Sequence, residues 1–160
     1  MKQLLFMAFL SITFFSCKND EYPKNTEGDI TWLTIDQAAT LQNQDQKYYF
    51  VDIYTEWCGW CKRMDKTTFK EKSVIDALNA NFHSVKFDAE QKEAINWQGQ
   101  QYVFKAGGRK GINTLAPVLL KNRLSYPSFV ILDSNRQIIS NIVGYQKPEQ
   151  LIAALNAVLR

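Results

Sequence analysis

Hydrophobic and polar positions along this chain follow two periods, and those periods predict strands that alternate with helices. Apolar runs with the composition of buried strands occupy residues 48–54, 82–88 and 128–132. Helical patterns run from Cys58 to about Lys70 and again from Pro148, after which apolar residues recur every three or four positions (Leu151, Ile152, Leu155, Val158 and Leu159). We therefore expect an α/β fold, with a central mixed sheet between layers of helices.

Boundary signals refine these elements. Thr34 and Gln37 have the spacing of a capping box, which predicts a helix ending near Asn43. Ser73 is expected to cap a helix over Val74–Leu78. Asp133–Arg136 reads as a hairpin turn that leads into a strand over residues 137–143.

The stretch between the second and third apolar runs is less regular. We expect a helical turn over Gln91–Trp97, a short strand over residues 101–104 and a turn over residues 106–109. A helix should follow over Asn113–Asn122, with Pro117 early in it. The glycines at 107, 108 and 111 superficially resemble a phosphate-binding loop, but their spacing differs from that of a P-loop, so a turn is the better interpretation.

The first residues have the pattern of an export signal. Leu4 to Ser16 carries no charge over thirteen residues, which is short for a membrane span but suits a signal-peptide core. The segment ending in Cys17 resembles a bacterial lipobox, although Phe15 stands where a small residue is more usual. We expect a lipoprotein signal peptide over residues 1–17 with lipidation at Cys17, a flexible tether over 18–29, and one folded domain over 30–160. The alternative is an ordinary secretory signal in which Cys17 is incidental.

Charge and cysteine content narrow the function classes. The net charge is +3 and no basic arm or block is present, which argues against a nucleic-acid partner. Export implies an oxidising compartment, where disulfides persist. Of the three cysteines, lipidation would account for Cys17. The other two, Cys58 and Cys61, are too few for a disulfide scaffold and suit a catalytic pair.

Cys58 and Cys61 lie three residues apart where the strand pattern gives way to a helical one. A helix brings such positions within about 5–6 Å, the Cα separation that a disulfide needs. At the helix start, unpaired N–H groups and the helix dipole favour a thiolate, so we expect an exposed Cys58 to be the nucleophile and Cys61 the resolving thiol. The alternatives are a static disulfide or half of a zinc site, for which His83 and the lipidation candidate Cys17 are the further candidate ligands.

Asp52 interrupts an otherwise apolar run, so we expect its carboxyl group to be buried. Burial should raise its pKa toward the range in which it accepts the proton of Cys61. A purely structural, hydrogen-bonded carboxylate is the alternative.

Three motifs together resemble the thioredoxin family. They are the segment Val51–Lys62 with its acidic residue six positions before Cys58, the sequence Tyr126-Pro127-Ser128 at a strand start, and Gly144 after the last strand. The resemblance implies a thioredoxin fold in which Pro127 is cis, its loop packs on the disulfide and the backbone of Tyr126 pairs with an extended substrate. A trans proline at the start of an edge strand is the alternative for Pro127.

The same resemblance assigns a substrate-contacting role to residues around the cysteines: Trp57, Gly59, Trp60, Tyr126, Pro127 and Gly144. Trp60 is expected to tune the reduction potential and partner contact, whereas Trp57 has packing against the core as an equal alternative. The family's lysine partner for Asp52 matches Ser84 here, with Lys86 two residues on as a possible substitute. Two departures follow: Lys66 replaces the family's helix proline, so that helix need not kink, and residues 91–112 form an insertion before the cis-proline strand.

The predicted function is thiol–disulfide exchange with cysteine-containing proteins of the bacterial envelope, with the reducing direction favoured. The disulfide Cys58–Cys61 would be the redox centre, with no cofactor or metal. Expected partners are protein substrates, a membrane or periplasmic redox partner, and a membrane reached through a lipid anchor, with the domain monomeric and facing the periplasm or cell surface. The alternative is a non-catalytic binding lipoprotein, including metal delivery, that uses the insertion to hold a partner.

Overall fold

The computed structural model describes residues 28–42, 44–107 and 110–160. Its centre is a five-stranded sheet in the order β1 (Trp32–Thr34), β3 (Phe82–Asp88), β2 (Tyr48–Tyr54), β8 (Ser128–Leu132) and β9 (Ile138–Val143). β1, β3 and β2 are parallel, whereas β8 and β9 are antiparallel to their neighbours. The mixed sheet is therefore confirmed. The predicted signal peptide, Cys17 and nearly all of the predicted tether lie outside the described residues.

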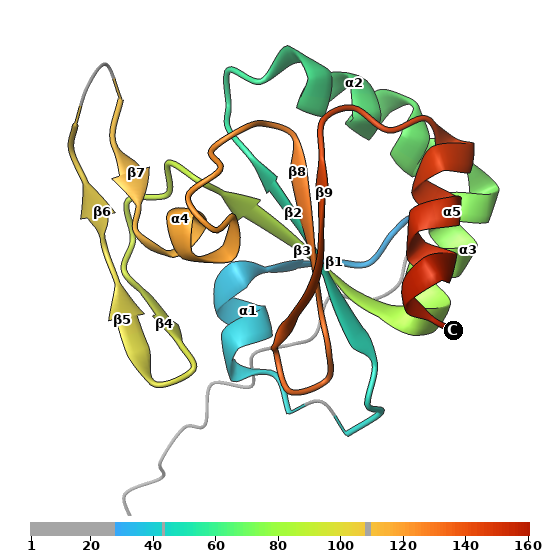
Figure 1. The fold of residues 1–160 in the computed structure, drawn as a ribbon, viewed down its shortest axis with the longest axis horizontal. Helices are drawn as coiled ribbons and strands as arrows, with labels where there is room; N and C mark the ends of the chain where they lie inside the picture. The colour runs from blue at the N-terminus through green and yellow to red at the C-terminus, as the bar shows by residue number, and fades with distance from the viewer. Residues whose placement is uncertain (1–27, 43, 108–109) are drawn as a thin grey trace, which may run out of the picture.

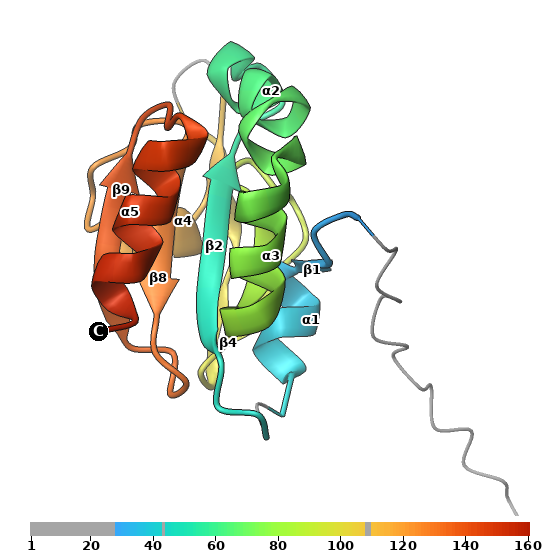
Figure 2. The same ribbon diagram turned by 90° about the vertical axis from the view of Figure 1, so that its right-hand side faces the viewer.

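Helices cover both faces of this sheet (Figures 1 and 2). One face carries α1 (Ile35–Thr40) and α4 (Leu115–Leu119), and the other carries α2 (Gly59–Lys66), α3 (Lys72–Asn81) and α5 (Pro148–Val158). Each face has its own cluster of buried apolar side chains. The sheet thus separates two cores, as the alternation of strands and helices predicts.

Strand β2 contributes to both cores because successive side chains point to opposite faces. Tyr49, Val51 and Ile53 belong to the core beneath α1 and α4. Phe50 belongs to the other core, where its ring stacks on Phe129 with centroids 5.4 Å apart. Asp52 has the same parity as Phe50, so its carboxylate enters the layer that holds α2.

Several helix ends differ from the sequence expectation. The capping box at Thr34 and Gln37 is confirmed, but α1 ends at Thr40. The helix that follows the cysteines breaks at Thr67 into a 3-10 turn over Thr68–Lys70, although no proline is present. The Thr67 hydroxyl donates to the carbonyl of Arg63 at 2.8 Å, a local bond that competes with helical geometry. Ser73 is not a cap, because α3 already begins at Lys72 with Glu71 as its N-cap residue.

Residues 91–107 and 110–113 contain short paired strands in place of the predicted helical turn over Gln91–Trp97. β4 (Ile95–Trp97) pairs with β5 (Gln100–Tyr102), and β6 (Phe104–Lys105) pairs with β7 (Ile112–Asn113). Gln98 and Gly99 both have positive φ, the conformation of a tight hairpin turn. The next helix, α4, is shorter than expected and has Pro117 as its third residue. The predicted turn over residues 106–109 lies partly outside the described residues.

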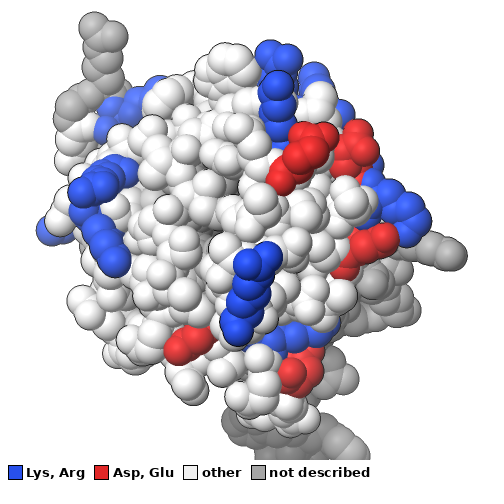
Figure 3. Space-filling view, turned by 45° about the vertical axis from the view of Figure 1, so that its right-hand side comes forward, with Lys and Arg blue, Asp and Glu red and all other residues white. Residues whose placement is uncertain are grey.

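The described surface carries mixed charge. On the face in Figure 3, basic and acidic side chains stand singly or in small groups among uncharged ones, without a continuous basic stripe. Among the residues that the structure describes, no helix has both the length and the apolar character needed to span a bilayer.

Candidate active site

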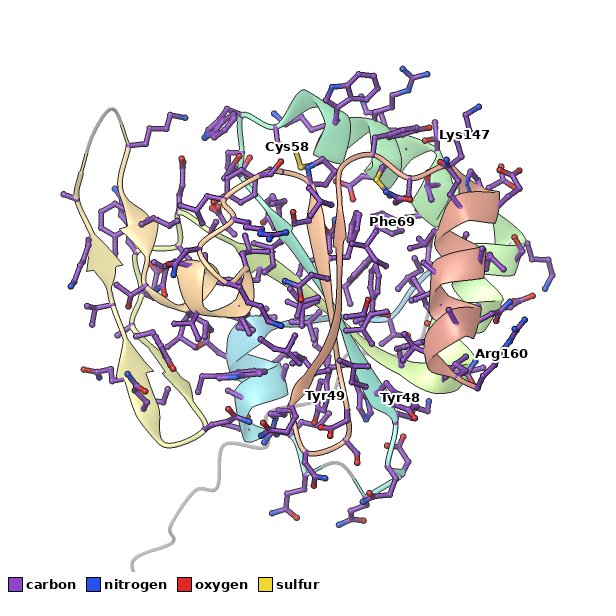
Figure 4. All side chains as sticks on the ribbon, in the orientation of Figure 1. Tyr48, Tyr49, Cys58, Phe69, Lys147 and Arg160 are labelled. Atoms are coloured by element: carbon purple, nitrogen blue, oxygen red, sulfur yellow. A yellow bond between two sulfur atoms is a disulfide. The ribbon has the colours of Figure 1, made fainter. Side chains whose placement is uncertain are left out.

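Cys58 and Cys61 form a disulfide where β2 ends and α2 begins, and Figure 4 shows Cys58 at that end of the sheet. Their Cα atoms are 5.3 Å apart, in the range expected for residues three apart at a helix start. Cys58 is the N-cap residue of α2, and its Sγ accepts a hydrogen bond of 3.1 Å from the backbone N–H of Cys61. The predicted pairing of the two cysteines is therefore confirmed.

The expected exposure of Cys58 is wrong for this oxidised state. Cys58 is only 4% exposed and Cys61 only 3%. Because the Cys58 sulfur caps the helix, it turns back toward the first turn of α2 instead of toward solvent. The same contact places the sulfur at the positive end of the helix dipole, which favours its thiolate form after reduction.

Asp52 is buried beneath the cysteine loop and paired with a lysine. The residue is 1% exposed, and one of its carboxylate oxygens lies 2.6 Å from Lys86 Nζ. The sheet register places Asp52 opposite Lys86, whereas Ser84 lies opposite Phe50. The match of the family's lysine position to Ser84 is therefore wrong, and Lys86 is the partner of Asp52.

A second, partly exposed acid also contacts Lys86. Asp65, four residues after Cys61 on α2, also accepts a hydrogen bond from Lys86 Nζ. Burial raises the pKa of Asp52 to about 6, since the opposing effect of Lys86 is smaller and Asp65 adds to the rise. Burial acts to lower the pKa of Lys86, but the two carboxylates outweigh it and the pKa is raised, so the lysine stays charged.

A cavity of about 300 Å³ connects this cluster with the resolving cysteine. Its walls include Cys61, Asp65 and Lys86. The second carboxylate oxygen of Asp52 has no hydrogen-bond partner within the described part of the chain. Cys61 and Lys86 thus border the same cavity, and Lys86 in turn contacts Asp52, so one side chain connects the resolving cysteine's surroundings to the buried acid.

The peptide bond between Tyr126 and Pro127 is cis, which confirms the sequence expectation for Pro127. Gly144 follows β9 with φ +86°, and its N–H donates to the carbonyl of Pro127 at 2.8 Å. This bond ties the cis-proline loop to the end of β9. The Tyr126 ring meets Trp57 edge to face with centroids 5.9 Å apart, so this loop lies beside the cysteine segment.

The two tryptophans next to the cysteines are both exposed. Trp57 is 55% exposed, so the alternative in which it packs in the core is wrong, and Trp60 is 53% exposed. The Trp60 ring packs against Tyr145 at 5.3 Å, and the guanidinium of Arg63 lies over both rings. Gly59 is the first residue of α2, and a Cβ there would have open space around it.

The region does not have the features of a metal centre. In residues 28–42, 44–107 and 110–160, no group of three or more His, Cys, Asp or Glu side chains is arranged to hold a metal ion. His83 is 5% exposed, and its Nε2 lies 2.9 Å from Asp45. The structure thus gives His83 a partner away from the two cysteines.

Sequence reasoning missed several residues around the site. Asp65 had one available signal, since a position four residues after Cys61 lies on the same helix face. Glu90 and Lys110 had none: they reach Trp57 only because the chain folds back, with Trp57 Nε1 donating to Glu90 at 2.7 Å and Lys110 Nζ 5.4 Å from the indole centroid.

Comparison with known proteins agrees with this geometry. Residues 35–159 match the thioredoxin-like domain family. The chain is 33% identical over 67 residues to the thiol:disulfide interchange protein DsbD of Pseudoalteromonas atlantica, covering 42% of this chain and 11% of that protein. It is 27% identical over 90 residues to a protein disulfide-isomerase of Datisca glomerata, covering 56% of this chain and 17% of that protein. The chain therefore spans less than a fifth of the length of these two relatives.

Solved structures share the fold. A thioredoxin from Thermus thermophilus superposes with a TM-score of 0.59 at 16% identity, covering 82% of this chain and 88% of that one. A protein of Bacteroides thetaiotaomicron, named for a proposed disulphide-isomerase activity, superposes with a TM-score of 0.58 at 22% identity, covering 86% and 98%. The family match spans most of the chain, and the fold and the paired cysteines agree with it. This chain belongs to the thioredoxin-like family.

Proposed function

We propose that this protein is a thiol–disulfide oxidoreductase that exchanges disulfides with cysteine-containing proteins. The observation that carries the proposal is the Cys58–Cys61 pair at the start of α2, with the buried Asp52 behind it. The family membership supports the same reaction class.

In the first step, the Cys58 thiolate of the reduced protein attacks one sulfur of a substrate disulfide. A bond forms between Cys58 and that sulfur, the substrate S–S bond breaks, and the other substrate sulfur leaves as a thiolate. The N–H of Cys61 and the dipole of α2 stabilise the attacking thiolate. A low thiol pKa at Cys58 is therefore required by the proposal.

In the second step, Cys61 attacks Cys58, re-forms the internal disulfide and releases the second substrate sulfur. Asp52 takes up the Cys61 proton by way of the cavity beside Lys86 and Asp65. The released thiolates then take up protons. The substrate gains two electrons and two protons, and a dithiol partner protein must supply two electrons to restore the reduced pair.

The surface around the cysteines is the proposed substrate platform. In this proposal the backbone of Tyr126, before the cis Pro127, pairs with an extended substrate segment, while Gly144 holds this loop in place. Trp57 and Trp60 provide apolar contact area beside the disulfide. Gly59 lies in open space between the cysteines, which leaves room for a substrate backbone.

We also propose that the protein acts outside the cytoplasm in the reducing direction. The export signal and the lipobox resemblance at Cys17 support anchoring to a bacterial membrane. In a bacterial host, the wild-type protein should sediment with membranes and incorporate labelled fatty acid, whereas Cys17→Ser should do neither and Cys61→Ser should behave as wild type. Labelling of Cys17→Ser would overturn the anchor.

The exchange activity is tested by insulin reduction and by trapping. Cys58→Ser should lose all insulin reduction, and Cys61→Ser should accumulate mixed disulfides between Cys58 and its substrates. The opposing idea, a binding lipoprotein without exchange activity, predicts two thiols of ordinary reactivity. Rapid alkylation of a single thiol near neutral pH supports the enzyme, and a slow pair together with no trapped partner contradicts it.

A further inference from the structure

A groove of about 520 Å³ lies next to the disulfide, between the cysteine segment and the hairpin region. Trp57 and Tyr126 form one side, and each directly precedes a residue of the exchange site, Cys58 or Pro127. The other lining residues are Glu90, Lys110, Gly111, Ile112 and Leu124. Its volume is in the range of sites that hold a bound group.

The hairpin wall is firmly attached to the domain. Asn113 is fully buried, and its side-chain amide donates to the carbonyls of Gln91 and Glu93 while its side-chain oxygen accepts from the N–H of Leu115. Its backbone N–H also donates to Ala89 at 2.8 Å. These bonds hold β7, and with it the groove wall that begins at Ile112, against the end of β3.

The hairpin also needs a glycine at the groove. A Cβ at Gly111 would lie 2.1 Å from the Phe104 ring and 2.6 Å from the carbonyl oxygen of Lys105. The backbone at Gly111 can therefore approach the opposing strand closely.

The two charged side chains of the groove, Glu90 and Lys110, interact with each other and with the indole of Trp57. Glu90 accepts the Trp57 Nε1 hydrogen bond and lies 3.9 Å from Lys110 Nζ, while Lys110 lies over the Trp57 ring. Their opposite charges leave no net charge to attract an ion. The remaining walls are ring and aliphatic carbon, with Trp57 and Leu124 half exposed.

We propose that this groove is a side-chain subsite for the substrate protein, and that it takes a large apolar side chain, aromatic or aliphatic, close to the cysteine under attack. The inference rests on the proposed exchange function, since the residues that directly precede Cys58 and Pro127 line the groove. An apolar side chain gains by leaving water in such a groove, whereas a charged one would lose hydration without an unpaired counter-charge. The groove, to which the hairpin region contributes one wall, thus selects the substrate.

The test uses the reduced protein and symmetric peptide disulfides in a single turnover. Each peptide has one cysteine, and a variable residue is placed in turn at each position within two residues of it. Because the dimer is symmetric, attack on either sulfur gives the same products. Phenylalanine or leucine at one of these positions should react about 10-fold faster than serine, aspartate or lysine at the same position.

Two matched variants locate the effect. Leu124→Ser should bring the ratio of the phenylalanine and serine rates close to one. Val118→Ser removes an apolar side chain of the same 50% exposure on α4, outside the groove, and should keep the wild-type ratio. Circular dichroism of both variants checks that they fold as the wild type does.

The outcomes separate the subsite from the function itself. Equal rates for all peptides, a preference for a charged residue, or an unchanged ratio in Leu124→Ser would overturn the subsite while leaving exchange activity in place. If the wild-type protein reduced none of the peptides and also failed to reduce a small disulfide such as oxidised glutathione, the proposed function would be overturned, and the subsite with it.

Discussion

Asp52 is the residue whose chemistry depends most on its surroundings. It lies in the middle of a buried strand, and its ion-pair partner Lys86 comes from the neighbouring strand and borders the cavity beside Cys61. With a pKa of about 6, the Asp52 carboxyl is present in both ionised and protonated forms near neutral pH, where the Cys61 thiol must lose its proton. That pKa makes Asp52 a suitable proton acceptor in the second step.

Replacing Asp52 by asparagine keeps the shape of the side chain but removes the proton acceptor. We expect Asp52→Asn to slow the second step roughly 100-fold at pH 7, the lower range for a positioned base, with much less effect on the first step. Stopped-flow measurement of the two steps with a peptide disulfide resolves them. Asp76→Asn, an exposed acid on α3, is the matched control and should behave as wild type. Equal slowing of both steps would contradict the role of Asp52.

Lys86 holds down the pKa of Asp52 against the effect of burial. In Lys86→Gln we expect the Asp52 pKa to move above 6, because the positive charge that stabilises the carboxylate is gone. Carboxyl NMR titration of the oxidised protein measures this directly. Lys66→Gln, at the end of α2, should leave the titration of Asp52 unchanged, and a fall of the Asp52 pKa in Lys86→Gln would be inconsistent with the assignment.

The site residues that could be identified from the sequence are those that belong to a short local motif. Cys58 and Cys61 are separated by one helical turn, and Pro127 stands at a strand start, so neighbouring residues are enough to recognise them. Lys86 could not be assigned, because a shift of the register between β2 and β3 by two residues changes the partner of Asp52 without changing either sequence pattern. The pairing of the strands decides that contact.

At the scale of elements, the long buried strands and α5 were predictable because a strong period extends over each of them. The hairpins from β4 to β7 were not, because strands of two or three residues are too short to show a period. The positive φ values at Gln98 and Gly99 decide the structure there, and a Gln-Gly pair is a weaker turn signal than Asn-Gly.

Gly111 tests whether the β6–β7 hairpin is as closely packed as its backbone indicates. Gly111→Ala should lower the free energy of unfolding by about 1–3 kcal/mol, because the Phe104 ring can move but the Lys105 carbonyl can do so only with its strand. Chemical denaturation measures the change. Gly107→Ala lies in open space in the same region and should change the stability little, whereas equal stability of the two variants would contradict close packing at Gly111.

At the scale of the whole molecule, the stability of the fold should depend on pH through Asp52. The carboxyl has a pKa of about 6 in the folded protein and near 3.8 in the unfolded chain. Between these values the folded protein holds the extra proton, so its free energy of unfolding falls as the pH rises. Above about pH 7 Asp52 is ionised in the folded protein as well, and its free energy of unfolding falls no further through this group.

The difference in unfolding free energy between the wild type and Asp52→Asn isolates this effect from other titrating groups. From pH 3 to pH 8 the wild type should lose about 3 kcal/mol relative to the variant, the value that a shift of this size implies. Urea denaturation of the two oxidised proteins at several pH values measures the difference. A difference that is constant with pH, or that grows in favour of the wild type as the pH rises, would mean that the pKa of Asp52 is not raised in the folded protein. Asp52 would then lack the property that suits it to accept the proton of Cys61.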